Sequence, residues 1–237
     1  MKTKLSAILI LLILIVPQLF AQSRPKGDSK IGFGLIGGVN LQILNGKDFW
    51  GEQLKNKLVF GFHGGLNASI PFAPDLYFQP GLLYTVKGAQ KKIFESPIKG
   101  DEVAITTTIN LNYIELPLNL LYRPQLGDGH IILGFGPYAA YGISGKVKTR
   151  GGNLTSNLDV KFRNIVKESD SGDDFAYYRP FDAGANILAG YEFYYGVFLQ
   201  LNAQVGLLKV NPEYELLTND KTSYRNNGFG LSAGYRF

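Results

Sequence analysis

The 237-residue sequence has no cysteine, two histidines, one methionine and one tryptophan, and only 18% of its residues are charged. Without cysteine, the chain can form no disulfide framework and can carry no lipid anchor on a cysteine. Beyond residue 21, no apolar run approaches the ~20 residues that a membrane-spanning helix needs. These absences exclude a disulfide-stapled domain, a cysteine-anchored lipoprotein and a helical membrane domain.

The scarcity of histidine also limits the chemistry. A hydrolase or acyltransferase would need a serine and a carboxylate beside His63 or His130. Ser69 shares the predicted face of His63, but it lies six residues along the same strand, too far for a direct hydrogen bond. No His/Asp/Glu spacing suggests a metal site, and glycine-rich strings lie inside predicted strands rather than at nucleotide-binding turns. The sequence therefore predicts no enzyme, no catalytic residue, no cofactor and no metal.

The first residues have the pattern of a secretory signal peptide. Two lysines precede an apolar run, Leu5–Val16, and small Ala21 follows. We expect a signal peptide over 1–21 and a short polar segment over 22–30, although Leu19 departs from the small residue usual three positions before a cut. A membrane anchor is the alternative, and the apolar run is short for one.

The rest of the chain, 31–237, is rich in glycine (29) and in tyrosine and phenylalanine (14 and 16). Such a composition without helical periodicity suits a β-barrel whose apolar residues are spread by alternation. The net charge of +5 favours anionic lipid head groups as partners over nucleic acid, because a secreted chain meets no nucleic acid.

Strict alternation is clearest in the segment 226–237. One face carries aromatic and aliphatic residues and the other carries small or polar ones. This pattern predicts the sealing strand of an outer-membrane barrel, and we expect the barrel-assembly machinery to bind it. A half-buried strand of a soluble sandwich is the alternative. The apolar face consists of Phe229, Leu231, Ala233, Tyr235 and Phe237.

Seven further segments alternate in the same way, and the connections between the eight run long, short, long, short, long, short, long. This predicts an all-β fold: an eight-stranded antiparallel up-and-down transmembrane β-barrel with long extracellular loops and short periplasmic turns. A lipocalin-like soluble barrel, with its polar face outward, is the alternative that alternation alone does not exclude. The seven segments are 31–42, 58–70, 76–87, 106–123, 130–144, 181–193 and 197–208.

Three prolines, Pro80, Pro117 and Pro137, fall inside predicted strands. Each removes a donor from the hydrogen-bond ladder, and lipid cannot replace it. We expect bulges or local kinks at these positions rather than a broken barrel.

Three stretches carry a resemblance to a known family: QPGLLYTVKGA (79–89), LNYIELPLNLLYRP (111–124) and GFGPYAAYGISG (134–145). With these the chain resembles the PorT-like outer-membrane β-barrel family. The resemblance implies a barrel in the outer membrane of a Gram-negative cell envelope. The family's named member is linked to protein secretion, so secretion-apparatus proteins are implied as partners. It implies no catalytic residues.

Four charged residues share the inward parity: Glu115, Arg123, Glu192 and Arg236. The lumen of an eight-stranded barrel is just wide enough for its own side chains, so we expect no diffusion pore. We predict that these residues form a structural charge network plugging the lumen, because buried charges must be paired. A proton or substrate path is the alternative.

Cations are concentrated in the predicted long connection 145–180. We interpret these cations as solvated side chains. The alternative interpretation is that they contact lipopolysaccharide phosphates. Outer-membrane lipids and lipopolysaccharide are therefore expected partners. These cations are Lys146, Lys148, Arg150, Lys161 and Arg163.

The leading hypothesis is a monomeric outer-membrane barrel with a structural, adhesive or secretion-associated role, acting through its loops and periplasmic rim. Two alternatives stay open at this point. One is a barrel-embedded enzyme acting on lipid or protein at the membrane surface. The other is a soluble periplasmic lipocalin-like carrier.

Overall fold

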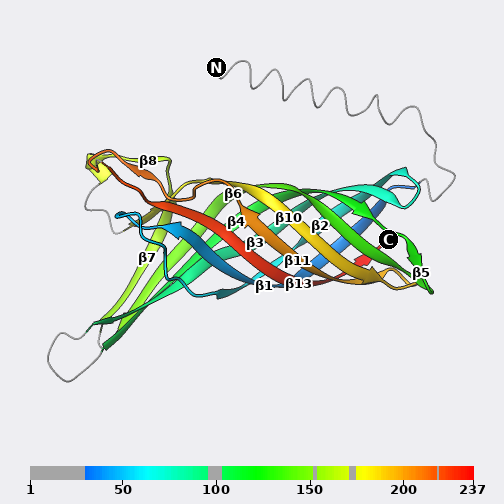
Figure 1. The fold of residues 1–237 in the computed structure, drawn as a ribbon, viewed down its shortest axis with the longest axis horizontal. Coiled ribbons are helices and arrows are strands. Elements are labelled where there is room, and N and C mark those ends of the chain that lie inside the picture. Colours follow the sequence, from blue (N-terminus) through cyan, green and yellow to red (C-terminus); the bar gives the residue numbers. More distant parts are fainter. Residues whose placement is uncertain (1–29, 96–102, 152–153, 171–174, 218) are drawn as a thin grey trace, which may run out of the picture.

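The structure, a computed structural model, describes residues 30–95, 103–151, 154–170, 175–217 and 219–237. The predicted signal peptide and all but the last residue of the polar segment lie outside this part. Among the described residues, no helix is both long and apolar enough to cross a membrane. What the described residues form is a closed, elongated barrel of tilted strands (Figure 1).

Eight strands close the barrel within the described part of the chain, and every neighbouring pair is antiparallel. The predicted up-and-down topology is confirmed, because each strand pairs with the next barrel strand and β13 pairs with β1 to close the ring. The strands are β1 (Gly32–Lys47), β2 (Val59–Ala73), β3 (Leu76–Glu95), β4 (Val103–Tyr122), β6 (Gly129–Gly151), β10 (Phe181–Glu192), β11 (Val197–Gly206) and β13 (Ser223–Arg236).

The two faces of the barrel wall differ as the alternation predicts. On β11, Leu201 is 63% exposed on the outside, whereas its neighbour Gln200 is 9% exposed and points inward. The same holds around the ring: outward positions are large and apolar, and inward positions include most of the buried polar groups. A soluble lipocalin-like barrel would have the opposite polarity, with apolar residues inside. The outer surface is therefore suited to lipid.

At the extracellular end of the barrel, several strands extend further than predicted. We expected loops over 88–105 and 145–180, but β3 continues to Glu95, β4 begins at Val103 and β6 continues to Gly151. The lysines, glycines and threonines on these extensions interrupt the apolar alternation, so the pattern hid them, although Ala89 is buried and Val147 packs against a buried cluster. Ladder hydrogen bonds to neighbouring strands hold the extensions.

Smaller elements complete this outer region. β7 (Leu154–Phe162) pairs with the end of β6, and β9 (Phe175–Tyr178) runs parallel to β7. Figure 1 shows β7 and β8 at the end of the barrel opposite the label C. The remaining elements are β5 (Gln125–Leu126) in a periplasmic turn, β8 (Ile165–Val166), a single 3-10 turn η1 (Glu168–Asp170), and β12 (Glu213–Tyr214), which pairs with β8.

The register shows no bulge at the in-strand prolines, so that part of the expectation is wrong. The register is the same on both sides of Pro80, Pro117 and Pro137, and the ladder lacks a few paired positions beside each of them. A missing N–H removes one donor without inserting a residue, so the register need not change. The recorded register shifts fall between Pro71 and Ala73 and between Asn112 and Tyr113.

Glycine has a steric role inside this narrow barrel. A Cβ on Gly234 would lie 2.2 Å from the ring of Phe198, and a Cβ on Gly142 would lie 2.3 Å from the ring of Phe162. Contacts this short do not occur, so a large side chain on one strand occupies the space left by a glycine on another. At other strand glycines, such as Gly65 and Gly136, the atom nearest to an added Cβ is a backbone carbonyl oxygen of the neighbouring strand instead.

The opposite facing of Leu201 and Gln200 is testable on one strand at one depth. We expect Leu201→Arg to lower the free energy of folding into lipid vesicles by ~2–4 kcal/mol, because it places a charge against lipid. Denaturant titration in phosphatidylcholine vesicles measures this. Leu201→Gln should also destabilise, while Gln200→Leu should disturb only packing in the lumen. Folding of the unmodified chain in buffer without lipid or detergent would contradict the assignment.

Candidate functional site

The candidate site is the interior of the barrel, which is arranged in layers along its axis. Successive inward residues of β4 are two positions apart, so each lies one step further along the barrel axis than the last, and together they pass through the layers in order. Apolar residues come first on the extracellular side, a charged layer follows, then a polar chamber, a second apolar layer and a second charged layer. On β4 and its end the residues are Leu111, Tyr113, Glu115, Pro117, Asn119, Leu121 and Arg123.

The extracellular mouth is closed by apolar packing. Leu111 and Tyr113 are buried in a cluster with Tyr178 of β9 and Val210 of the connection between β11 and β13. Phe162 of β7 packs against the same cluster. The elements outside the ring therefore cover the lumen.

The first charged layer is centred on Lys87, whose side chain is fully buried. Its Nζ lies 2.7 Å from Glu115 Oε2 and 3.1 Å from Asp182 Oδ2, and both acidic side chains are also buried. The three residues come from β3, β4 and β10, so the cluster bridges the lumen. One positive charge faces two negative charges, which leaves the layer with a formal charge of −1.

Neutral groups complete the coordination of the two carboxylates. Gln204 Nε2 donates to Glu115 Oε1 at 2.6 Å, and Asn226 Nδ2 donates to Asp182 Oδ2 at 3.0 Å. Tyr138 donates its hydroxyl to Asp182 at 3.3 Å, and Lys87 Nζ lies 4.1 Å from the centre of the Tyr138 ring. These hydrogen bonds and the cation–π contact compensate for loss of water around buried charges.

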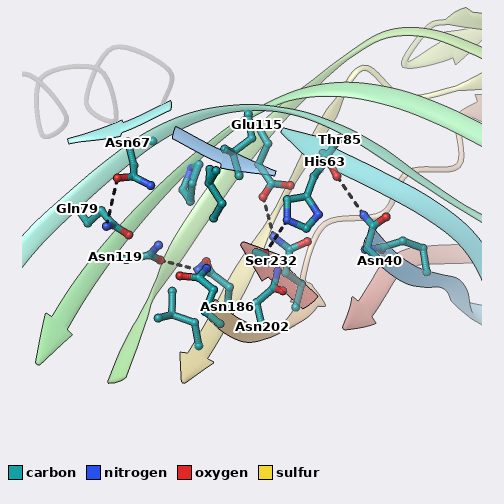
Figure 2. Close-up of a pocket in the computed structure, with 18 residues that line it drawn as sticks. Asn40, His63, Asn67, Gln79, Thr85, Glu115, Asn119, Asn186, Asn202 and Ser232 are labelled. Carbon is teal, nitrogen blue, oxygen red and sulfur yellow. Dashed lines mark hydrogen bonds between the residues drawn. The ribbon is translucent and has the colours of Figure 1, made fainter. Parts of the chain in front are cut away.

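Below this layer lies a small polar chamber of about 50 Å³ (Figure 2). Hydrogen bonds cross it between strands: Asn186 donates to Asn119 at 2.5 Å, and Gln79 donates to Asn67 at 3.4 Å. A chamber of this volume has room for a few water molecules, far below the ~300 Å³ of a small-molecule pocket. Its polar lining is Asn40, Gln42, His63, Asn67, Gln79, Thr85, Glu115, Asn119, Asn186, Gln200, Asn202, Gln204 and Ser232.

His63 and Ser232 form a hydrogen bond in this chamber, with 2.8 Å between His63 Nε2 and Ser232 Oγ. Sequence analysis considered only Ser69 for His63 and missed Ser232, which lies 169 residues away and is brought close by the ring. A serine bonded to a histidine is the arrangement that nucleophilic hydrolases use. Here both groups are buried and the nearby Glu115 already binds Lys87 and Gln204.

The second charged layer lies at the periplasmic end. Glu192 accepts from Arg123 Nη2 at 2.7 Å and from Arg236 Nε at 3.0 Å, and all three side chains are buried. Arg236 Nη1 also donates to Ser69 Oγ, and the Arg123 guanidinium lies 4.5 Å from the Tyr77 ring centre. Two positive charges face one negative charge, so this layer has a formal charge of +1.

The structure therefore divides the predicted set of four inward charges. Arg123, Glu192 and Arg236 meet in one cluster, whereas Glu115 belongs to the other layer, with Lys87 and Asp182. Leu121, Ile132, Leu188 and Phe198 form the apolar layer between the chamber and the periplasmic cluster. Among the described residues, no three His, Cys, Asp or Glu side chains are grouped as a metal site would require.

Alternation already placed Lys87 and Asp182 on the polar faces of their strands. Alternation could not show that Lys87 pairs with Asp182, because the relative depth of two distant strands depends on ring closure and register. The signal in the sequence was a charged residue at an inward position. Lys87 and Asp182 carry this signal in the same way as the four predicted residues.

Comparison with known proteins gives one family match and several similar solved structures. A family model described as outer membrane protein beta-barrel domain matches residues 20–211. The search of the curated proteins gives no match. Among solved structures, the chain is similar to Ail, the attachment invasion locus protein of Yersinia pestis, with 12% identity over 88% of this chain and 99% of Ail (TM-score 0.38). It is also similar to Neisserial surface protein A, with 15% identity over 86% of this chain and 95% of that protein (TM-score 0.39).

The charged layer around Lys87 should be critical for stability. We expect Lys87→Met to reduce the free energy of unfolding by ~3–5 kcal/mol, because it leaves two buried carboxylates without a cation. Denaturant titration in lipid vesicles measures the change. The matched control is the triple variant Lys87→Met, Glu115→Gln and Asp182→Asn, which removes all three charges and should recover part of the loss. A stable single variant, or a triple variant no better than the single one, would contradict this account.

Proposed function

Because the chain belongs to the outer membrane protein beta-barrel family and resides in the bacterial outer membrane, we propose that it is a PorT-like scaffold that acts through its two rims. In this proposal it is neither a pore nor an enzyme. Its partners are outer-membrane lipids, lipopolysaccharide and proteins of a secretion apparatus. Adhesion through the extracellular sheet is the second role compatible with such a scaffold.

The observation that carries the proposal is the layered interior. A diffusion pore needs a continuous aqueous path, but here an apolar cap, two charged layers and an apolar layer follow one another along the axis. The chamber between them holds about 50 Å³. An interior filled in this way is typical of eight-stranded barrels and favours a role at the surface.

Both rims offer groups that could bind other proteins. At the periplasmic end, Tyr194 and Tyr195 in the turn between β10 and β11 are 88% and 64% exposed, and the Tyr195 ring stacks on Phe193. At the extracellular end, Trp50 is exposed in the connection between β1 and β2. Exposed aromatic side chains are enriched among residues that dominate protein interfaces.

The secretion-associated role can be separated from the adhesive role by a pair of variants. We expect gentle detergent extraction of cells after cross-linking to recover envelope proteins with the barrel. Tyr194→Ser with Tyr195→Ser should remove them, because aromatic anchors contribute most of an interface's affinity. Trp50→Ser is the control on the opposite rim and should leave recovery unchanged. Loss only in the Trp50 variant would favour adhesion, and recovery unaffected by either change would contradict a role for the rims.

The hydrogen bond between His63 and Ser232 is the one specific observation that favours an enzyme. We propose that this pair is structural, because it is buried under the charged layer and its chamber is too small for a substrate. A catalytic serine must be reached by the bond that it attacks.

The enzyme alternative is tested by a serine-reactive fluorophosphonate probe on the folded protein in detergent. We expect no labelling of Ser232, because the probe has no route to it. Ser232→Ala and, as control, the more exposed Ser144→Ala should give the same result as the unchanged chain. Labelling that disappears in Ser232→Ala but persists in Ser144→Ala would establish a reactive serine and sink the non-enzymatic proposal.

A further inference from the structure

The outer surface has a groove where the extended strands meet the barrel wall. It has a volume of about 510 Å³ and is lined by residues of β2, β3, β4, β6 and β7. Figure 1 shows the extended strands around β7 projecting beyond the barrel at this end. The groove is therefore at the extracellular boundary of the lipid-facing surface.

The part of the groove nearest the barrel is apolar. Phe60, Phe62 and Ile143 are each at least half exposed on the outer surface. The Phe62 ring lies 5.8 Å from that of Tyr84, centre to centre. Aromatic residues at this level form the girdle expected where a barrel leaves the hydrocarbon region. Acyl chains are the natural neighbours of this surface.

The part of the groove furthest from the barrel is cationic. Lys146 and Lys148 of β6 are exposed and lie on the same face, and Asp159 of β7 is the only acidic residue in the lining. Lys146 Nζ lies 3.9 Å from Asp159 Oδ1, with both side chains about two-thirds exposed. Such a loose surface pair contributes little, so both ammonium groups stay available to an anion.

The spacing along β6 places these lysines at the level of lipid head groups. Lys146 is three residues beyond Ile143, which is about 10 Å along a strand at ~3.3 Å per residue. With a tilt of about 40°, the distance along the membrane normal is about 8 Å. That is similar to the thickness of one head-group layer, about 5–8 Å. Asn112 and Ser144, which bond to each other at 2.8 Å, add polar groups between Ile143 and the lysines.

We propose that this groove binds a phosphate-bearing lipid of the outer leaflet, with its phosphate between Lys146 and Lys148 and its acyl chains along Phe60 and Phe62. The two halves of the groove match the two halves of such a lipid in polarity, charge and depth. Lysine binds phosphate as a mobile point charge, which suits a head group that need not be held rigidly. The inference rests on the lipid partnership in the proposed function and not on the secretion role, so it and the secretion role can fail separately.

The test measures lipid binding to the detergent-purified barrel by native mass spectrometry. Diphosphoryl lipid A is the probe, phosphatidylcholine is the reference lipid, and glucosamine 1-phosphate is the soluble head-group competitor. We expect retention of lipid A over phosphatidylcholine. Lys146→Gln with Lys148→Gln should weaken lipid A binding at least about tenfold, because each cation at a membrane surface contributes to anion binding.

Two further variants make the result specific to the groove. Lys209→Gln with Lys221→Gln removes two exposed lysines of the connection between β11 and β13, which do not line the groove, and should leave binding unchanged. Asp159→Asn should strengthen binding several-fold, because it removes the competing carboxylate. A circular dichroism spectrum with unchanged β content confirms that each variant is folded.

Three outcomes would overturn the inference. Equal binding by the unchanged chain and the Lys146/Lys148 variant would show that these lysines do not hold the phosphate. An equal loss in the Lys209/Lys221 variant would show that only overall charge matters. Displacement of lipid A by glucosamine 1-phosphate at the affinity of the lipid itself would show an anion site without the acyl-chain part.

Discussion

Closure of the sheet at eight strands is the constraint on which the rest of the structure depends. A ring of this size leaves a lumen that its own side chains must fill, and lipid outside offers no hydrogen bonds. Inward charged and amide groups are therefore paired with side chains of other strands, as Lys87 is with Asp182 and Asn119 with Asn186. Among the described residues, a few buried atoms such as Asn40 Oδ1 and Gln42 Oε1 have no protein partner. The inward glycines follow from the same restriction, since the Phe198 ring fits only because Gly234 has no side chain.

The same constraint explains why charge is divided between two layers. One cation between two carboxylates around Lys87 gives −1, and one carboxylate between two guanidinium groups around Glu192 gives +1. Neither layer is neutral by itself, but together they cancel. An apolar layer and the polar chamber separate them. The opposite excess charges attract each other across these two layers.

Sequence reasoning succeeded where one physical rule acts along a whole strand. Lipid outside and polar groups inside impose a two-residue alternation, so the eight strands and the facing of Leu201 and Gln200 could be predicted. It failed for the upper parts of β3 and β6, where residues such as Lys91 or Lys148 meet water and the alternation disappears. It also could not pair Lys87 with Asp182 or His63 with Ser232, because such contacts depend on how distant strands align in depth.

The barrel and its extracellular extension are therefore stabilised in different ways, and this separation has a functional consequence. The lipid-embedded part is filled and internally paired, so little of its chemistry is open to other molecules. The extension consists of ladder-bonded strands with exposed lysines, such as Lys146 and Lys148, whose ammonium groups stay accessible after folding. The lipid-embedded part and the extension meet at the groove beside Ile143. There the apolar barrel wall and the lysines of β6 are close enough for one lipid to contact both. A filled barrel whose accessible polar groups lie at the membrane boundary fits the proposed binding of partners better than the passage of solutes.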